Sequence, residues 1–440
     1  MQPGLRRKRS PAAATFSNSI FQQPHLSTTL GTALQFLFVH QNFPGQFLHI
    51  LRHLAATGQH NIVCITQENA NFIPGVRKAT YRGPGELNLS THRDAQEFDH
   101  AMARAQGVAQ VAVSLKALGF RPDVIIGHHG WGEMLNLGDV WPGVPTLGYY
   151  EFYYNIKGFD VNFDPEFPTL PDALPRVRSK NAVNMLALDN PGHGITPTRF
   201  QRSTYPDWAQ GRIDILAEGA DLDVCNADAD AAGRVFRQGD LVVRPGEKLV
   251  TYVARDLEPY RGFHVVMRAL PSLLRARPDV KVALVGGNSV SYGARLQEGT
   301  WREHMLREVG PSLDLARVQF CGRLDHADYV RLLQRSDAHV YFTYPFVASW
   351  SLREALAIGC AIVASDTAPV QEFIACGQTG LLTPFLDPAA LSLRIQEALE
   401  DTSLAARLRA GARSYAERHL RMQDHITSYT RLIEGLVAAG

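Results

Sequence analysis

The sequence predicts an α/β protein built from two doubly wound domains. Apolar runs of strand length alternate with helix-like stretches almost from end to end, which is typical of parallel sheets with crossover helices. The chain has 440 residues, more than one hydrophobic core usually serves, because a domain commonly holds about 100 to 200. The alternation is interrupted by the polar, acidic stretch 218–230 and restarts at Leu249. A domain boundary near residue 230 follows.

In the first half, an apolar run passes through the polar loop 40–46 into a helical pattern at 47–56. The stretch 155–212 is rich in Pro, Asn, Asp and aromatic residues, with a helical patch at 180–188, and we interpret it as an elaborated region that faces the substrate. The strands expected in this half are 34–39, 61–66, 123–127 and 145–150.

In the second half, strands and helices alternate regularly, as expected for one further doubly wound domain. The expected strands are 249–254, 280–286, 317–320, 338–342 and 361–364. The expected helices are 262–276, 300–309, 327–334 and 350–358, followed by a helical C-terminus. We therefore divide the chain into segments 1–33, 34–230, 231–415 and 416–440.

Residues 1–33 differ from the rest of the chain. They contain four basic residues at positions 6–9, no acidic residue, many Ser, Thr, Ala, Gln and Pro, and no apolar segment of signal-peptide length. We interpret this segment as a disordered leader or an overlong start, with an organelle transit peptide as the alternative.

Composition excludes several classes of partner. Lys and Arg number 44 against 43 Asp and Glu, so nothing favours a nucleic-acid partner. No apolar run reaches the roughly 18 residues of a membrane span, so any membrane contact would be peripheral. The five cysteines are widely spaced and form no C-x-x-C pair, which favours a reducing cytoplasm.

Two arginines follow the strand expected at 249–254. Arg255 and Arg261 lie in a loop that opens a helix, and a guanidinium group binds phosphate through a planar fork, so the pair suits a diphosphate. Solvated surface charges are the alternative interpretation. The next strand ends in Gly286 and Gly287, where a ligand could approach the main chain closely, although two glycines also make a plain turn.

The stretch 344–364 reads as strand end, irregular turn, helix closed by glycine, and strand. A carboxylate in the first turns of that helix can accept hydrogen bonds from the two hydroxyls of a ribose, and Glu354 is the candidate. The alternative is a capping box, because Ser351 precedes Glu354 by three residues.

Together these residues give a family resemblance. The C-terminal half resembles glycosyltransferase family 4, whose members have two Rossmann-like domains facing a cleft, the GT-B fold. The first half matches more loosely, through residues 38–45 and 121–128, where the family places an acceptor-side glycine loop and a histidine. The matches in the second half are Arg255 with Arg261-Gly262-Phe263, Val285-Gly286-Gly287, Phe320-Cys321-Gly322-Arg323, Glu354-Ala355-Leu356-Ala357-Ile358-Gly359, Ser365-Asp366 with Glu372, and Gly377-x-Thr379-Gly380-Leu381-Leu382.

The resemblance implies a role for each matching residue. Arg255 and Arg261 grip the donor diphosphate, six residues apart where five is commoner in the family, and Glu354 binds the ribose. His128 bonds the donor sugar or assists proton movement, unless it is an ordinary loop histidine. The implied catalytic residues are His128, Arg255 and Arg261. The implied donor-binding residues are Gly45, Gly286, Gly287, Ala348, Ser349, Trp350, Glu354 and Glu372. The residues expected on the acceptor side are His129, Trp131 and Glu133.

One position departs from the family. The first glutamate of its E-x7-E element falls at Phe346, and Val347, Ala348 and Ser349 replace a glycine-rich turn whose backbone N–H groups face the phosphates. The stretch Pro-Phe-Val-x-Ser-Trp-Ser therefore indicates a variant subfamily, and the identity of the donor sugar stays open.

The family reaction is transfer with retention of configuration and without a required metal. Charge developing on the leaving diphosphate would meet Arg255, Arg261 and the helix that begins near Ser349. Two D-x-D pairs, Asp221 with Asp223 and Asp228 with Asp230, are interpreted as solvated linker. No cofactor or metal is expected.

The main hypothesis is a hexosyltransferase-type glycosyltransferase that moves a sugar from a nucleoside diphosphate to a glycan, lipid-linked or small-molecule acceptor on the first domain. The alternatives are a GT-B epimerase acting on a nucleotide sugar and a non-catalytic subunit that binds sugar nucleotides or glycans. By the resemblance, the final helix returns to the first domain. The aromatic residues of the first-half loops fit a lipid acceptor at the inner face of the membrane, and equally ordinary packing; they are Phe43, Phe47, Phe152, Tyr153 and Tyr154.

Overall fold

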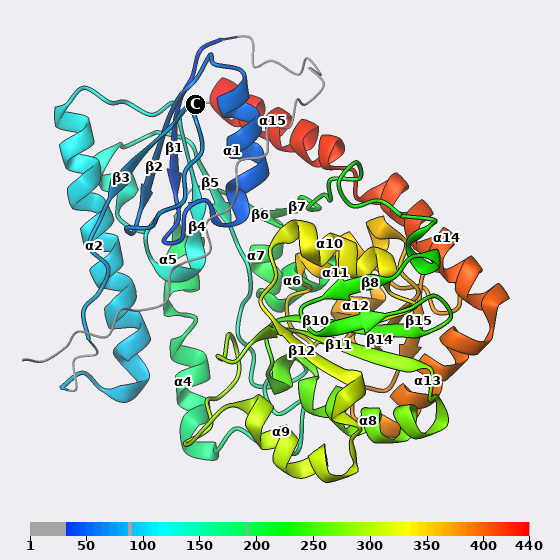
Figure 1. Ribbon diagram of the computed structural model, residues 1–440. Coiled ribbons are helices and arrows are strands. Elements are labelled where there is room, and N and C mark those ends of the chain that lie inside the picture. Colours follow the sequence, from blue (N-terminus) through cyan, green and yellow to red (C-terminus); the bar gives the residue numbers. More distant parts are fainter. Residues whose placement is uncertain (1–31, 87–89, 191, 440) are drawn as a thin grey trace, which may run out of the picture.

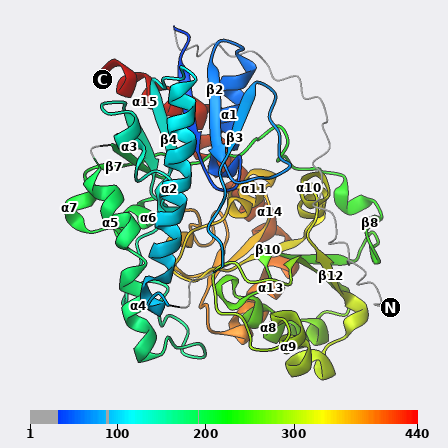
Figure 2. The ribbon, with the colours of Figure 1, turned by 90° about the vertical axis from the view of Figure 1, so that its left-hand side faces the viewer.

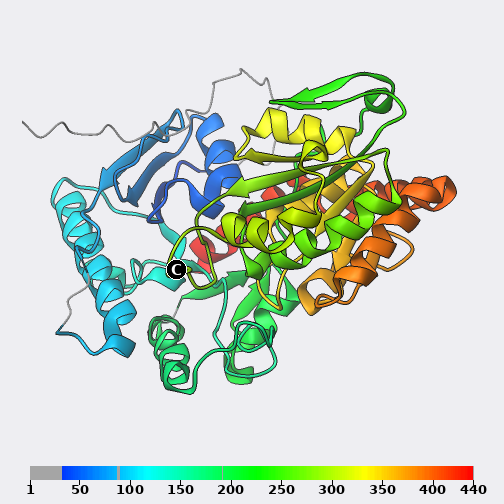
Figure 3. The same ribbon diagram turned by 60° about the horizontal axis from the view of Figure 1, so that its bottom comes forward.

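The computed structural model describes residues 32–86, 90–190 and 192–439. Within these residues the chain forms two parallel sheets, each with helices on both faces, that lie side by side (Figures 1 and 3). The α/β class and the two doubly wound domains are thereby confirmed. The predicted disordered leader falls almost entirely on residues 1–31, outside the described residues.

The first sheet has seven parallel strands in the order β3-β2-β1-β4-β5-β6-β7. The four expected strands are present, and β3, β6 and β7 were not predicted, because they are short or lack a long apolar run. The strands are β1 (Gln35–Val39), β2 (Asn61–Thr66), β3 (Val76–Thr80), β4 (Val124–His128), β5 (Thr146–Tyr149), β6 (His193–Thr196) and β7 (Ile213–Ile215).

Alternate residues of these strands feed two different cores, as the period of two requires. Phe36 and Phe38 pack toward α1 and the C-terminal helix, whereas Leu37 and Val39 pack toward α2 and α3. Figure 2 shows the long α2 lying along the sheet. The helices of this domain are α1 (Leu48–Ala56), α2 (Gln96–Ala117), α3 (Leu137–Val140), α4 (Leu174–Ser179), α5 (Ala182–Asp189), α6 (Arg199–Thr204) and α7 (Asp207–Gln210).

The second sheet has six parallel strands in the order β12-β11-β10-β13-β14-β15, and a two-stranded hairpin precedes it. All five expected strands are present within two residues of the predicted limits, and β15 was not predicted. The strands are β8 (Phe236–Gln238), β9 (Leu241–Val243), β10 (Lys248–Asp256), β11 (Val280–Gly287), β12 (Val318–Gly322), β13 (Ala338–Tyr341), β14 (Ile362–Ser365) and β15 (Leu381–Thr383).

Helices α8, α9 and α13 contribute to the core on one face of this sheet, α10 and α11 to the core on the other, and α14 to both. The four expected helices correspond to α8 to α11. The helices are α8 (Phe263–Ala276), α9 (Trp301–Val309), α10 (His326–Arg335), α11 (Trp350–Ile358), α12 (Ala368–Gln371), α13 (Pro388–Glu400) and α14 (Thr402–His419).

The last helix, α15 (Met422–Ala439), leaves the second domain and packs on α1 and β4 of the first (Figure 1). Ile426, Tyr429 and Ile433 are buried in the core that Phe36 and Phe38 share. The structure thus carries the chain back to its first sheet. Among the described residues, no helix is long and apolar enough to cross a membrane.

One segment of the first half packs against the second domain. Phe152 belongs to the hydrophobic core of α8 and α13, and Tyr154, Phe159, Phe163 and Phe167 pack against that core. The segment 152–167 is therefore shared between the domains.

Candidate active site between the two domains

Both sheets reverse their strand order at a central strand. In the second sheet β10 lies between β11 and β13, and in the first β1 lies between β2 and β4. Crossover connections diverge at such a strand and leave room for a ligand at its C-terminal end. Most of the candidate residues lie at the ends of these and the neighbouring strands.

His128 ends β4 and is buried against aromatic rings. Its ring stacks on Tyr149 and on the 40% exposed Trp131, with centroids 5.4 and 6.1 Å away. The backbone N–H of Gly130 donates to Nδ1 at 3.0 Å, and Nε2 lies 3.5 Å from the Glu151 carboxylate. Packing and the Gly130 contact therefore hold the imidazole with Nε2 toward Glu151.

Glu151 follows β5 and keeps 28% of its side chain exposed. Burial by itself would raise the pKa of this carboxyl group, but the nearby His128 ring, with His40 and Arg255, outweighs burial and holds the pKa below its usual range. Because Arg255 belongs to the second domain, charges from both domains meet here.

The two arginines predicted to grip a diphosphate have different surroundings. Arg255 is exposed and has no hydrogen-bond or ion-pair partner within the described residues. Arg261 is buried; it donates to Thr343 Oγ1 at 2.8 Å and to the Val347 carbonyl at 2.9 Å, and its guanidinium lies over the Tyr292 ring. Within the described residues the Arg255 side chain is therefore unbonded, whereas the Arg261 side chain is hydrogen-bonded to the turn before α11.

Glu354 lies in α11 and accepts a hydrogen bond from, or shares a proton with, His326 Nε2 at 2.8 Å. The capping-box alternative is wrong, because α11 begins at Trp350 with Ser349 as its N-cap, and Glu354 makes no contact with the start of the helix. The Glu354 hydrogen bond raises the pKa of His326, although burial opposes it. Glu354 is thus a partly exposed carboxylate with an exchangeable partner.

The start of α11 lies beside Arg261, through the Val347 carbonyl. Ala348 is largely buried, and Trp350 contacts His49 of α1 with ring centroids 5.7 Å apart. The Ser349 N–H donates to Tyr341 Oη at 2.8 Å, so a phosphate would have to displace this hydroxyl to bind there.

The end of β11 meets the end of β10 with little space between them. A side chain at Gly287 would lie 2.4 Å from Asp256 Oδ1, so the close approach requires glycine there. A side chain at Gly286 would likewise meet Leu257, at 2.8 Å. The loop that follows donates three backbone N–H groups, from residues 291–293, to the fully buried carboxylate of Glu258.

Phe346 lies in an aromatic cluster that joins the domains. Its ring lies 4.6 Å from Phe152, 5.0 Å from Tyr292 and 5.6 Å from Tyr260, and it is 4% exposed. The second domain therefore presents an apolar ring at the position where a carboxylate was expected.

Four predicted site residues have other contacts. Glu372 accepts from the N–H groups of Arg199 and Phe200, so it caps α6 of the first domain and both its oxygens are engaged. His129 and Glu133 are buried inside the first domain, against Tyr150 and Tyr81 respectively, and present no surface to an acceptor. Gly45 lies against the His40 ring, which a side chain there would strike at 2.5 Å.

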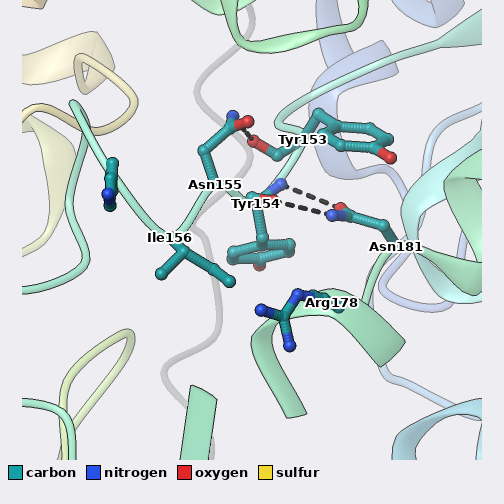
Figure 4. Close-up of a pocket in the computed structure, with 7 residues that line it drawn as sticks. Tyr153, Tyr154, Asn155, Ile156, Arg178 and Asn181 are labelled. Atoms are coloured by element: carbon teal, nitrogen blue, oxygen red, sulfur yellow. Dashed lines mark hydrogen bonds between the residues drawn. The ribbon is translucent and has the colours of Figure 1, made fainter. Parts of the chain in front are cut away.

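A hollow of about 560 Å³ lies beside the shared segment. Tyr154 and Asn181 exchange two hydrogen bonds in its wall, and Arg178 of α4 points toward Tyr154 (Figure 4). Lys157 and Arg178 are exposed and have no ion-pair partner among the described residues, and no carboxylate lines the hollow. It is lined by Tyr153, Tyr154, Asn155, Ile156, Lys157, Arg178 and Asn181.

Sequence reasoning missed three charged residues of this region: Glu151, Glu258 and His326. Each follows a strand or opens a helix, so proximity to a strand end was the available signal. Proximity to a strand end is a weak signal, because many residues of an α/β protein lie near one. Their importance comes from partners 23 to 35 residues away, which the local pattern does not indicate.

Comparison with known proteins gives matches over both halves. The family model for the glycosyl transferase family 4 group matches residues 58–225, and that for glycosyl transferases group 1 matches residues 238–415. The glycogen synthase of Mycobacterium tuberculosis is 30% identical over 387 residues, which cover 84% of this chain and 85% of that protein.

Solved structures show the same fold. Sucrose-phosphate synthase from Thermosynechococcus elongatus superposes with a TM-score of 0.70 at 18% identity and covers 93% of this chain and all of that one. The Anabaena HepE protein, solved in complex with UDP and glucose, gives 0.64 at 17% identity and covers 91% of this chain and 99% of that one. From the family models, the relative of similar length and the shared architecture, the chain belongs to glycosyltransferase family 4 and has its GT-B fold.

Proposed function

We propose that this glycosyltransferase binds a nucleoside diphosphate sugar at the ends of β10, β11 and β13. In this arrangement Glu354 receives the ribose hydroxyls, and Arg255, Arg261 and the start of α11 face the diphosphate. The observation that carries the proposal is that, within the described residues, the Glu354 carboxylate, although on a helix, is hydrogen-bonded to the side chain of His326 and does not cap the helix backbone. A neutral diol can replace that contact, because a carboxylate accepts two hydroxyl hydrogens.

Bond breaking leaves negative charge on the diphosphate, and the residues supply two fixed sources of positive potential for it. Arg261 keeps its charge, since burial, which lowers its pKa, is outweighed by Tyr341, Tyr292 and Glu258. The N-terminus of α11 adds a partial positive charge. Arg255 is exposed, has no partner to leave among residues 32–86, 90–190 and 192–439, and can approach the leaving group as it forms.

We infer that the sugar is transferred with retention and without a metal ion. Within the part of the chain that the structure describes, two groups of side chains come close enough to share an ion, Cys225 with His326 and Glu354, and Asp164 with Glu166 and His264. In each group a carboxylate already bonds the histidine, at 2.8 and 2.9 Å, which supports ion pairs. Transfer measured in excess EDTA is expected to match transfer with added Mg²⁺; a loss of more than about tenfold in EDTA would contradict this role for the arginines.

The acceptor is proposed to bind on the first domain. The hollow beside the shared segment carries two unpaired basic side chains and tyrosine rings, which suits an acceptor with an anionic group. D-inositol 3-phosphate glycosyltransferases are among the relatives, at 27% identity over 209 residues for that of Corynebacterium glutamicum. Peripheral membrane contact stays a prediction, and liposome flotation tests it.

A nucleotide-sugar screen tests the function. Thermal shifts with UDP-, GDP- and ADP-sugars are compared for the wild type, Glu354→Ala and Glu397→Ala, an exposed carboxylate of α13. Stabilisation by one base, lost in Glu354→Ala and kept in the control, with slow donor hydrolysis, is the expected result. Binding without hydrolysis or transfer would favour a non-catalytic subunit, and interconversion of the sugar would favour an epimerase.

A further inference from the structure

Glu151 lies where the two domains join, and its backbone is held on both sides. Its carbonyl accepts from Gln201 Nε2 at 2.9 Å, and the preceding Tyr150 N–H donates to Ile195 of β6 at 2.8 Å. The following residue, Phe152, packs on Phe346 of the second domain. The carboxylate is therefore presented from a fixed point at the end of β5.

The tautomer of the neighbouring histidine follows from its contacts. Because the Gly130 N–H donates to His128 Nδ1, that nitrogen has a lone pair, and in the neutral ring the hydrogen sits on Nε2. Nε2 is completely buried yet has no hydrogen-bond acceptor within the described residues, since Glu151 Oε2, at 3.5 Å, is too far for a good bond. Such a donor without an acceptor costs free energy unless a ligand or water supplies one.

Most other carboxylates at the domain junction have their hydrogen bonds already; Asp160 Oδ1 has none within the described residues, but that side chain is buried and its other oxygen accepts from Tyr260. Asp164 accepts from His264, Tyr344 and a backbone N–H, and Glu218 accepts from Tyr149 and faces Arg353. Glu258 and Glu372 are engaged by backbone N–H groups. Among the described residues, Glu151 is the junction carboxylate whose oxygens have a single distant neighbour, and 28% of its side chain is exposed.

The two unsatisfied groups fit one ligand group. A hydroxyl at the exposed edge of Glu151 donates its hydrogen to a carboxylate oxygen, and a small side-chain movement that uncovers the buried Nε2 lets the same hydroxyl oxygen accept the His128 hydrogen. A polyol such as a sugar ring supplies such hydroxyls, whereas a nucleotide base or phosphate does not. The charge of Arg255, on the second domain, lowers the pKa of Glu151, so the residue proposed to face the diphosphate lies within electrostatic range of this pair.

We propose that Glu151, with His128, binds hydroxyl groups of the donor's sugar ring. The inference rests on the proposed function and deepens it, because it assigns sugar recognition to a carboxylate of the first domain. Phe346 offers no polar atom at this place, and its ring packs on the residue next to Glu151. The turn before α11 thus lacks the expected carboxylate, and Glu151 after β5 offers one next to the residue on which Phe346 packs.

The test compares nucleotides with and without the sugar. Calorimetry measures the affinities of the wild type, Glu151→Gln and the control Glu97→Gln, an exposed carboxylate on α2, for UDP, UDP-glucose, GDP, GDP-mannose, ADP and ADP-glucose. The comparison uses the nucleotide base that the wild type binds. For that base, Glu151→Gln is expected to bind the free diphosphate within about twofold of the wild-type affinity. Its affinity for the nucleotide sugar is expected to fall about tenfold or more, as for loss of a charge-assisted hydrogen bond. Unliganded melting temperatures of the three proteins are expected to agree.

Three outcomes distinguish a failure of the Glu151 assignment from a failure of the proposed function. If Glu151→Gln binds the nucleotide sugar as tightly as the wild type, the assignment of Glu151 is wrong and the donor site stands. If the variant loses free diphosphate and nucleotide sugar equally, Glu151 supports the site and does not read the sugar, which also overturns the proposal. If the wild type binds none of the six compounds, the proposed function fails and the inference falls with it.

Discussion

At the scale of single residues, the site is organised by which ionisable groups keep a free hydrogen-bonding position. Arg261 and Arg255 carry the same charge and lie six residues apart, but Arg261 is bonded to the turn before α11, and Arg255 has no partner among the described residues. A bonded arginine such as Arg261 maintains the shape of the site, whereas an arginine without such bonds, such as Arg255, can move to contact a substrate.

The two arginines should therefore behave differently on substitution. Arg255→Ala is expected to lower the rate of transfer by about a hundredfold or more, as when a donor to developing charge is lost, with little change in melting temperature. Arg261→Ala is expected to lower both the rate of transfer and the melting temperature, because Thr343 and the Val347 carbonyl lose their partner. Steady-state kinetics and thermal unfolding check this; equal melting temperatures for the two variants would contradict the structural role of Arg261.

The pair of His326 and Glu354 predicts a pH dependence. The folded-state pKa of His326 is raised, so the pair contributes stability below the unfolded pKa of about 6.5 and loses it as pH rises through the folded pKa. A donor that needs Glu354 competes with this pair, so its affinity should fall as pH decreases from 8 to 6. Nearby His49 stays neutral there, because burial lowers its pKa to about 4.

His326→Ala is expected to bind the donor about three- to tenfold more tightly at pH 6, where the competing bond is strongest, and to flatten the pH profile. Calorimetry at three pH values measures this for the wild type and the variant. A profile of unchanged slope in His326→Ala would show that another group titrates.

At the scale of elements, the segment 152–167 connects the domains through buried polar contacts. Asp164 accepts from His264 of α8 and from Tyr344, both at 2.9 Å, and Asp160 accepts from Tyr260 at 2.8 Å. Burial would raise the pKa of Asp164, but the His264 bond, the Glu166 N–H and Tyr344 outweigh it and hold the pKa below its usual range. Asp164 is thus charged while buried, and its removal leaves the His264 ring, the Tyr344 hydroxyl and the Glu166 N–H without this acceptor.

Asp164→Ala is expected to destabilise the protein by about 3 kcal/mol or more, as breaking a buried pair does. Because the folded pKa of Asp164 is depressed, this contribution is present above the unfolded pKa of about 3.9 and is lost as pH falls below it. Urea unfolding at pH 7 measures the change. Glu166→Ala removes a partly exposed carboxylate next to it, paired with Arg268, and should cost less than about 1 kcal/mol.

At the scale of the whole molecule, the chain crosses between the domains more than once, and the hydrophobic core of each domain includes residues from the other half of the sequence. Helix α15 supplies Ile426, Tyr429 and Ile433 to the core of the first domain. Arg353 of α11 faces Glu218, which accepts from Tyr149 at the end of β5. Stability of the first domain should therefore depend on residues near the C-terminus.

Ile433→Ala is expected to lower the free energy of unfolding by about 2 to 4 kcal/mol, since this side chain is fully buried. The neighbouring Glu434→Ala, at an exposed position, should change it by less than about 0.5 kcal/mol. Hydrogen exchange of β1 and β4 amides reports where the loss occurs. Faster exchange confined to the second domain would contradict the role of α15.

The sequence by itself determined the α/β class, the order of the main strands and helices, and the family, because apolar periodicity and short ordered motifs are local features. It also placed Arg255, Arg261 and Glu354 at strand ends and on the helix after the turn. Short strands such as β6 and β7 were not predicted, because so short a strand forms only through pairing with its neighbours.

Only the tertiary structure decided which of these residues share a site. Glu372 caps a helix 172 residues away, and His129 and Glu133 turn inward while His128 faces Glu151. Such pairings depend on how the two sheets pack and on the segment that joins them, and no local pattern encodes that packing. The position of Glu151 beside His128 and within the field of Arg255 is therefore a property of the folded molecule alone.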